Sequence, residues 1–172
     1  MGSTCLITLL YEKNNDNYLK IINLGDCRSI FCNNYNIAIP LSKDHKPAQF
    51  EEKKRIEKEG GTIIYEIGDD PRISGLSVSR CFGDLDCKYI SQIPDVFDYK
   101  LHNIKFIVMA CDGVWDVLSN QDVVDFVCYE LCNQKLNKNL ATKNNNNIAY
   151  LLGLYALDKG STDNLSIIII FL

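Results

Sequence analysis

Three aspartates stand directly before or after an apolar segment and a fourth follows one turn later: Asp26, Asp112, Asp163 and Asp116. Taken singly, each is explained as a turn residue or as an acid in the first turn of a helix. Taken together, carboxylates gathered at the ends of neighbouring strands would repel one another unless cations lay among them. Mg²⁺ and Mn²⁺ prefer oxygen ligands and retained waters. Asp112 and Asp116, one turn apart, could bind the same ion.

Composition narrows the classes of protein to consider. The chain has 172 residues, of which 47% are hydrophobic, so it can bury a sizeable core. Its formal net charge is -4 and its Lys and Arg residues are scattered among acids, which argues against nucleic-acid binding. No apolar segment is long enough to cross a membrane, and the N-terminus lacks the features of a signal peptide. An intracellular, cytoplasmic protein that does not enter membranes is predicted.

The eight cysteines do not have the spacing of a zinc site or a disulfide framework. The closest pairs are separated by three to five residues, there is no C-x-x-C motif, and the chain has only two histidines. The cysteines are therefore predicted to be reduced thiols, several of them packed as small hydrophobic side chains.

The first half of the chain predicts short antiparallel strands and one exposed helix. Asparagine-rich turns separate the strand-forming segments, and a Gly-Gly pair ends the helix. The expected elements are strands at 3–11, 18–24, 28–32, 37–41 and 62–65, a helix at 48–59, a loop at 66–72 and an irregular stretch at 73–100.

The second half alternates buried strands with apolar helices. An apolar strand is expected at 104–111, and Ser-Asn-Gln-Asp at 119–122 is typical of a capping box that begins a helix running through Leu131. The apolar stripe of this helix, Val123, Val124, Val127, Cys128 and Leu131, indicates core packing. Residues 133–147 are predicted to be a low-complexity linker with a mobile asparagine run, followed by a helix at 148–157 and a buried strand at 165–172.

Six sequence blocks, in order along nearly the whole chain, make it resemble the metal-dependent type 2C protein serine/threonine phosphatases. They are Gly-Ser-Thr at 2–4, Asn-Leu-Gly-Asp-Cys-Arg at 23–28, Leu-Ser-Lys-Asp-His-Lys-Pro at 41–47, Leu-Ser-Val-Ser-Arg-Cys-Phe-Gly-Asp at 76–84, Asp-Gly-Val-Trp-Asp-Val-Leu-Ser-Asn at 112–120 and Gly-Ser-Thr-Asp-Asn at 160–164. The resemblance implies an α+β fold in which a β-sandwich of two antiparallel sheets is flanked by helices.

The resemblance also implies a binuclear Mg²⁺ or Mn²⁺ centre. Asp112 and Asp163 match the family's metal ligands, while Asp26, with Asp112 and Asp116, matches the acids of a further, weaker metal position. Metal-activated water would attack the phosphorus of a phosphoserine or phosphothreonine in a phosphoprotein substrate. Arg80 could bind the substrate phosphate, or it could instead pair with Asp84 or another acid.

The resemblance begins inside the family's catalytic domain. Members of the family carry, upstream of the Gly-Ser-Thr strand, a phosphate-binding Arg and an Asp-Gly-His-Gly-Gly segment that supplies a bridging metal ligand and the candidate general acid. Residues 1–172 are therefore predicted to be a partial type 2C domain with the N-terminal part missing, and the catalytic acid is unknown. Unpaired strand edges in such a piece could lead to self-association.

Two functions from different classes follow from these observations. The first is metal-dependent hydrolysis of phosphoserine and phosphothreonine in proteins. The alternative is a catalytically inactive pseudophosphatase or regulatory scaffold that keeps the fold and some of the acids but binds a protein partner.

Overall fold

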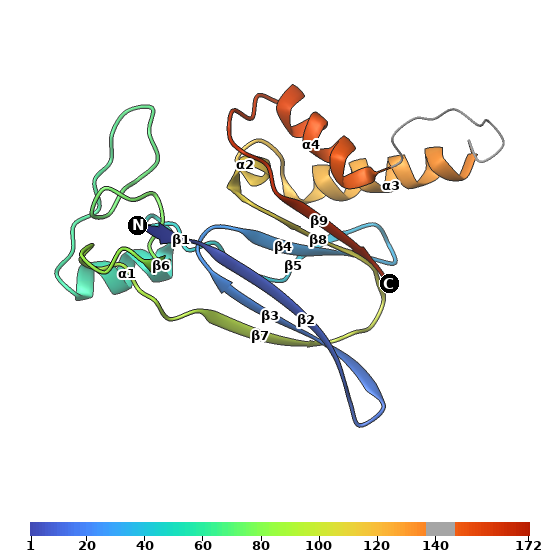
Figure 1. Cartoon of the computed structure of the whole chain (residues 1–172), viewed down its shortest axis with the longest axis horizontal. Coiled ribbons are helices and arrows are strands. Elements are labelled where there is room, and N and C mark those ends of the chain that lie inside the picture. Colours follow the sequence, from blue (N-terminus) through green and yellow to red (C-terminus); the bar gives the residue numbers. More distant parts are fainter. Residues whose placement is uncertain (137–146) are drawn as a thin grey trace. The chain divides into compact units, whose positions relative to one another are not determined.

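The computed structural model describes residues 1–136 and 147–172, and these form two compact units that interleave along the chain. The first unit contains residues 1–27 and 42–101, and the second contains residues 28–41 and 102–172. Each unit has its own antiparallel sheet and at least one helix (Figure 1). The predicted α+β class with two antiparallel sheets is thereby confirmed.

The sheet of the first unit has the strand order β2-β3-β7. Strands β2 (Cys5–Lys13) and β3 (Asp16–Leu24) form the predicted hairpin, in register from Cys5 opposite Leu24 to Lys13 opposite Asp16. Asn14 and Asn15 make the two-residue turn with φ of 54° and 63°, values that asparagine tolerates better than most residues.

Two predictions for the first unit are wrong. Strand β7 (Asp95–Lys100) pairs with β3 inside the stretch predicted to be irregular. Its residues alternate between half-buried and exposed, but three of them are charged, so the sequence does not show the alternation of apolar and polar residues that is typical of a strand. Conversely, the strand expected at 62–65 is only a single bridge between Ile64 and Arg72, because it pairs with its own loop rather than with a sheet.

The rest of the first unit surrounds the predicted helix, α1 (Phe50–Lys58). Ile56 on this helix packs with Ile63 and Ile73 in a small apolar cluster. The short strands β1 (Gly2–Ser3) and β6 (Phe82–Gly83) pair with each other, so the segment around residue 80 is held close to the N-terminus of the chain.

The sheet of the second unit has the order β5-β4-β8-β9 and is antiparallel throughout. Its strands are β4 (Arg28–Asn33), β5 (Ala38–Pro40), β8 (Ile104–Ala110) and β9 (Ile167–Phe171). Helices α3 (Asn120–Leu136) and α4 (Ile148–Asp158) lie over one face of this sheet (Figure 1). Phe106 and Val108 from β8 pack with the predicted valine stripe of α3 in one core.

The N-terminal ends of α3 and α4 are both set by capping side chains. The Ser119 hydroxyl accepts from Asp122 N at 3.1 Å, and Asp122 Oδ2 accepts from Ser119 N at 3.0 Å, which confirms the capping box. Helix α3 continues to Leu136, so the predicted linker is wrong over 133–136. Asn147 caps α4 by accepting from Ala149 N and Tyr150 N. The remainder of the predicted linker, residues 137–146, lies outside the described residues.

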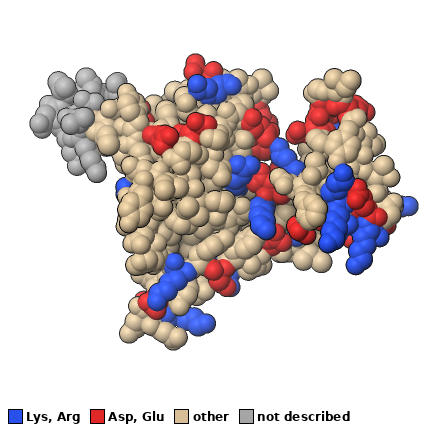
Figure 2. Space-filling model, turned by 180° about the vertical axis from the view of Figure 1, so that it is seen from behind, with Lys and Arg blue, Asp and Glu red and all other residues tan. Residues whose placement is uncertain are grey.

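The surface agrees with the charge pattern of the sequence. On the face shown in Figure 2, Lys and Arg side chains are interspersed with Asp and Glu rather than gathered into one basic field. Within residues 1–136 and 147–172, no helix has the length and apolar character needed to cross a membrane. All eight cysteines are free thiols, as predicted.

Candidate metal centre

Asp112 lies where the buried strand β8 gives way to the short helix α2 (Asp112–Trp115). Its Oδ1 accepts from the following amide, Gly113 N, at 3.0 Å. The backbone N of Asp116 donates to Asp112 O at 2.8 Å, so these two acids stand at the two ends of one helical turn. Trp115 anchors the turn, because its buried indole donates to Ala110 O at 2.9 Å.

The loop that carries Asp163 is bonded directly to the Asp112 turn. Ser161 Oγ donates to Gly113 O at 2.6 Å, and Cys111 N donates to Ser166 O at 3.2 Å. The Cys111 thiol adds two further bonds, to Asn164 O at 3.2 Å and from Ser166 N at 3.3 Å. Sequence segments about fifty residues apart are therefore joined at one end of the β8–β9 pair, as the metal-site hypothesis requires.

Gly113 allows the two loops to approach. A methyl group added at its Cα would lie 2.9 Å from Leu165 Cδ2, 3.1 Å from Asn164 O and 3.2 Å from Asp163 Cβ. A side chain at this position would have to push the Asp163 loop away from Asp112. The glycine is thus explained by close packing within a helix, where its backbone freedom is not needed.

We expect Gly113→Ala to weaken Mn²⁺ binding by about tenfold, because a shift of the Asp163 loop misplaces one of the two carboxylates. It should also lower the free energy of unfolding by about 1–3 kcal/mol through overpacking. Titration with Mn²⁺ and urea unfolding measure the two effects. Gly153→Ala in α4 is the matched control, since the nearest atoms there are 3.7 and 3.8 Å away. Unchanged Mn²⁺ affinity in Gly113→Ala would contradict the role given to this contact.

Asp26 belongs to the first unit, in the turn that follows β3. Only 4% of the residue is exposed. The preceding residue, Gly25, has φ of 121°, and a methyl group on it would lie 2.3 Å from Thr4 Cγ2. The structure therefore joins the Asp163 loop to the Asp112 turn within the second unit, with Asp116 one helical turn from Asp112, and Asp26 belongs to the first unit.

Arg80 is paired with acids, as one of the two interpretations of the sequence held, but Asp84 is not among them. Its Nε and Nη2 donate to Glu52 Oε1, while Nη1 donates to Asp95 Oδ1 and to Ile93 O, each at 2.9 Å. Four of the five guanidinium N–H donors are thus committed to the protein. This arrangement argues against Arg80 as a phosphate contact, because a bound phosphate would have to compete with two carboxylates.

Glu52 is the buried acid beside Arg80 that sequence reasoning missed. It is 3% exposed and accepts from Arg80, from Ser79 Oγ at 2.7 Å and from Arg55 Nη2 at 3.1 Å. Burial alone would raise the pKa of this carboxyl, but the hydrogen bonds from Arg80 and Ser79 and the charge of Arg80 outweigh burial and lower the pKa to about 2. The one available signal was its position one turn before the buried Ile56 on α1.

The donor chemistry of the Asp112 and Asp163 loops fits a hard divalent cation. Both side chains offer carboxylate oxygens, and Mg²⁺ is commonly held by one or two carboxylates with the remaining positions filled by water and substrate phosphate. Within the described part of the chain, no group of three or more His, Cys, Asp or Glu side chains is arranged to hold a metal ion.

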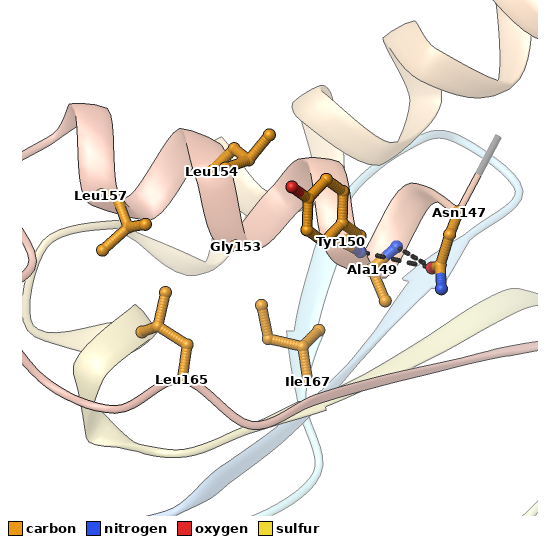
Figure 3. A pocket seen from close by; sticks show the side chains of 8 residues that line it. All are labelled: Asn147, Ala149, Tyr150, Gly153, Leu154, Leu157, Leu165 and Ile167. Carbon is orange, nitrogen blue, oxygen red and sulfur yellow. Dashed lines mark hydrogen bonds between the residues drawn. The ribbon is translucent and has the colours of Figure 1, made fainter. Parts of the chain in front are cut away.

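A groove near these loops has a different character. It lies between α4 and the segment leading into β9, has a volume of about 350 Å³, and is lined mainly by Tyr150, Leu154, Leu157, Leu165 and Ile167 (Figure 3). No carboxylate lines it, so its chemistry does not suit a metal ion.

Comparison with known proteins agrees with the motifs and the fold. The family model for protein phosphatase 2C matches residues 1–165. A PP2C-like domain-containing protein, R307, of Acanthamoeba polyphaga mimivirus is 44% identical over 170 residues, covering 89% of this chain and 93% of that protein. Protein phosphatase 1L of Bos taurus is 39% identical over 132 residues, covering 73% of this chain and 35% of its own length.

Among solved structures, a phosphatase from a pathogenic strain of Toxoplasma gondii matches 91% of this chain and 48% of its own chain, with a TM-score of 0.72 and 31% identity. The chain therefore belongs to the protein phosphatase 2C family. It spans nearly all of the viral relative but less than half of the bovine and Toxoplasma proteins.

Proposed function

We propose that this chain supplies part of the metal centre of a protein phosphatase that hydrolyses phosphoserine and phosphothreonine in proteins. Membership of the protein phosphatase 2C family supports the reaction class. The observation that carries the proposal is the bonding of the Asp163 loop to the Asp112 turn through Ser161 and Cys111, because two distant acids are thereby held at one strand end.

In this proposal Asp112 and Asp163 hold a binuclear Mg²⁺ or Mn²⁺ centre, and Asp116 and Asp26 contribute to a further, weaker position. Such a centre, when bound, would activate water and offset the negative charge that develops on the phosphoryl group. The two acidic loops supply negative oxygens from a rigid base, since Trp115 and the bonds of Cys111 fix the backbone on both sides. We assign no general acid, and Arg80 is not carried forward as a substrate contact.

Phosphate release from phosphoserine and phosphothreonine peptides tests the reaction. We expect Mn²⁺-dependent release by the full-length protein and a loss of at least about a hundredfold in Asp112→Asn, a magnitude typical of removing one electrostatic group from a catalytic site. A folded protein that releases no phosphate with Mn²⁺, or one that is equally active as Asp112→Asn, would refute the proposal. The first result would favour the pseudophosphatase or scaffold.

The remaining predictions about partners and location stay predictions. The family implies a phosphoprotein substrate. Strands β2, β7 and β9 are at the edges of their sheets. Because an edge strand can pair with a strand of another chain, self-association remains a proposal. The intracellular, cytoplasmic location also stays a prediction, and the eight free thiols support it because free thiols are typical of reducing compartments.

A further inference from the structure

We propose that His45 is a positioning residue that holds the Gly25–Asp26 turn for metal binding, with Asp95, Arg80 and Glu52 as its buried support. The inference rests on the proposed function, because Asp26 is given the role of a metal ligand there. It assigns a purpose to a network of charged groups that the reaction itself does not use.

His45 bonds to both the backbone N–H and the backbone carbonyl of Gly25, the residue before Asp26. Gly25 N donates to His45 Nδ1 at 3.0 Å, and His45 N donates to Gly25 O at 2.9 Å. Asn23 Nδ2 adds a bond to the same carbonyl at 3.1 Å. Gly25 therefore has both its amide and its carbonyl fixed, and the direction in which the chain enters Asp26 is fixed with them.

The bond from Gly25 determines which form of the imidazole is present. Because Nδ1 accepts a hydrogen bond, the ring proton must be on Nε2, which faces Asp95 Oδ2 at 3.2 Å. Burial and the nearby charge of Arg80 lower the pKa of His45, although Asp95 opposes them. A neutral ring with its acceptor toward Gly25 is thus the stable form.

The support behind His45 forms a closed ring of contacts. Asp95 bridges His45 and Arg80, Arg80 bonds to Glu52, and Glu52 accepts from Ser79 Oγ. Ser79 N then donates to His45 O at 2.8 Å, which returns the ring to its starting residue. The members come from α1, β7 and the loops at 41–47 and 76–84, so the position of His45 is set by several elements at once.

A network that served only stability could bond to any backbone group. The network around His45 bonds to Gly25, the residue before the candidate metal ligand Asp26. Metal ligands must be held within about 0.5 Å of their productive positions. Loss of a group that orients a ligand typically weakens metal affinity by about 10 to 100-fold. His45 would act in this way through the main chain of Gly25.

Two substitutions of His45 separate its two contacts. The side-chain oxygen of asparagine in His45→Asn reaches the place of Nδ1 and can accept from Gly25 N, whereas the amide of glutamine in His45→Gln reaches the place of Nε2 and keeps Asp95 but not Gly25. Two readouts are taken on the full-length protein: Mn²⁺ affinity at the weaker step of binding, from electron paramagnetic resonance of free Mn²⁺, and the hydrogen-exchange rate of the Gly25 amide.

We expect His45→Asn to keep Mn²⁺ affinity within about threefold of the unsubstituted protein, and His45→Gln to weaken it by about 10 to 100-fold while speeding exchange at Gly25. Equal affinities in the two variants, or faster exchange in His45→Gln with unchanged affinity, would overturn the inference. If His45→Gln does not fold, Arg80→Lys takes its place, since it keeps the charge but loses the fork that holds Glu52 and Asp95. Unchanged affinity in Arg80→Lys would then overturn it.

Asp26→Asn and Asp112→Asn distinguish failure of this inference from failure of the proposed function. Loss of the weaker step in Asp26→Asn, together with loss of all tight binding in Asp112→Asn, supports both. If Asp112→Asn abolishes binding but Asp26→Asn changes nothing, the inference is overturned and the centre on Asp112 and Asp163 stands. If neither substitution changes Mn²⁺ binding, the proposed function has failed first.

Discussion

Asp112→Asn and Asp163→Asn should each lower the affinity for Mn²⁺ by at least about a hundredfold, since removing a ligand costs more than the 10 to 100-fold lost with a group that only orients one. Each substitution replaces a charged oxygen donor by a neutral amide while conserving volume. The loops themselves should persist, because their joining bonds come from Cys111, Ser161 and Ser166. Isothermal titration calorimetry measures the affinity, and circular dichroism checks that the variants fold.

The control is Asp158→Asn, which removes the same charge from an exposed position at the end of α4 in the same unit. Its Mn²⁺ affinity should match that of the unsubstituted chain. A comparable loss in Asp158→Asn would show that Mn²⁺ responds only to net charge, and the pairing of Asp112 with Asp163 would lose its support.

Glu52→Ala should lower the free energy of unfolding by about 3–5 kcal/mol, the usual cost of removing one partner from a buried ion pair. The substitution would leave Arg80 with Asp95 and the Ile93 carbonyl, and it would remove the acceptor of Ser79 Oγ and one acceptor of Arg55 Nη2. Urea unfolding gives the value. Glu57→Ala on the same helix is the control, because its pair with Lys53 is exposed and should contribute less than about 1 kcal/mol. Similar losses in the two variants would contradict the central place given to Glu52.

The same carboxyl predicts how stability depends on pH. Its pKa is about 2 in the folded chain, against an ordinary value of 4.5. A lowered carboxyl pKa stabilises the folded state above pH 4.5, and this contribution is lost as the pH falls from 4.5 towards 2. The difference amounts to roughly 3 kcal/mol at about 1.4 kcal/mol per pKa unit. Glu52→Gln should lack this decline, and a parallel decline in both proteins would show that other groups cause it.

The fold was most predictable where local pattern and burial coincide. The apolar run that becomes β8, the capping box at Ser119 and the asparagine turn between β2 and β3 were all read correctly from the sequence. Strand β7 was missed because it pairs with β3, a partner far along the chain, while charged residues obscured its alternation. Pairing over such separations leaves little trace in a single sequence.

The candidate site was also predictable only in part. The positions of Asp112 and Asp163 beside apolar strands indicated that their loops lie close together, and the bonds that join these loops follow from the pairing of β8 with β9. The partners of Arg80 could not be predicted, because Glu52 comes from a helix whose composition is that of an exposed element. Only folding shows that one acid on this helix is turned inward and shared among three donors.

The most direct test of the metal centre is the anomalous difference density of crystals of the full-length protein grown with Mn²⁺. The account predicts a peak roughly 2.1 Å from a carboxylate oxygen of Asp112 and at a similar distance from one of Asp163, or a pair of peaks, each bound to one of these acids and bridged by solvent. Mn²⁺ bound elsewhere on the protein, with Asp112 and Asp163 making only protein and water contacts, would contradict it.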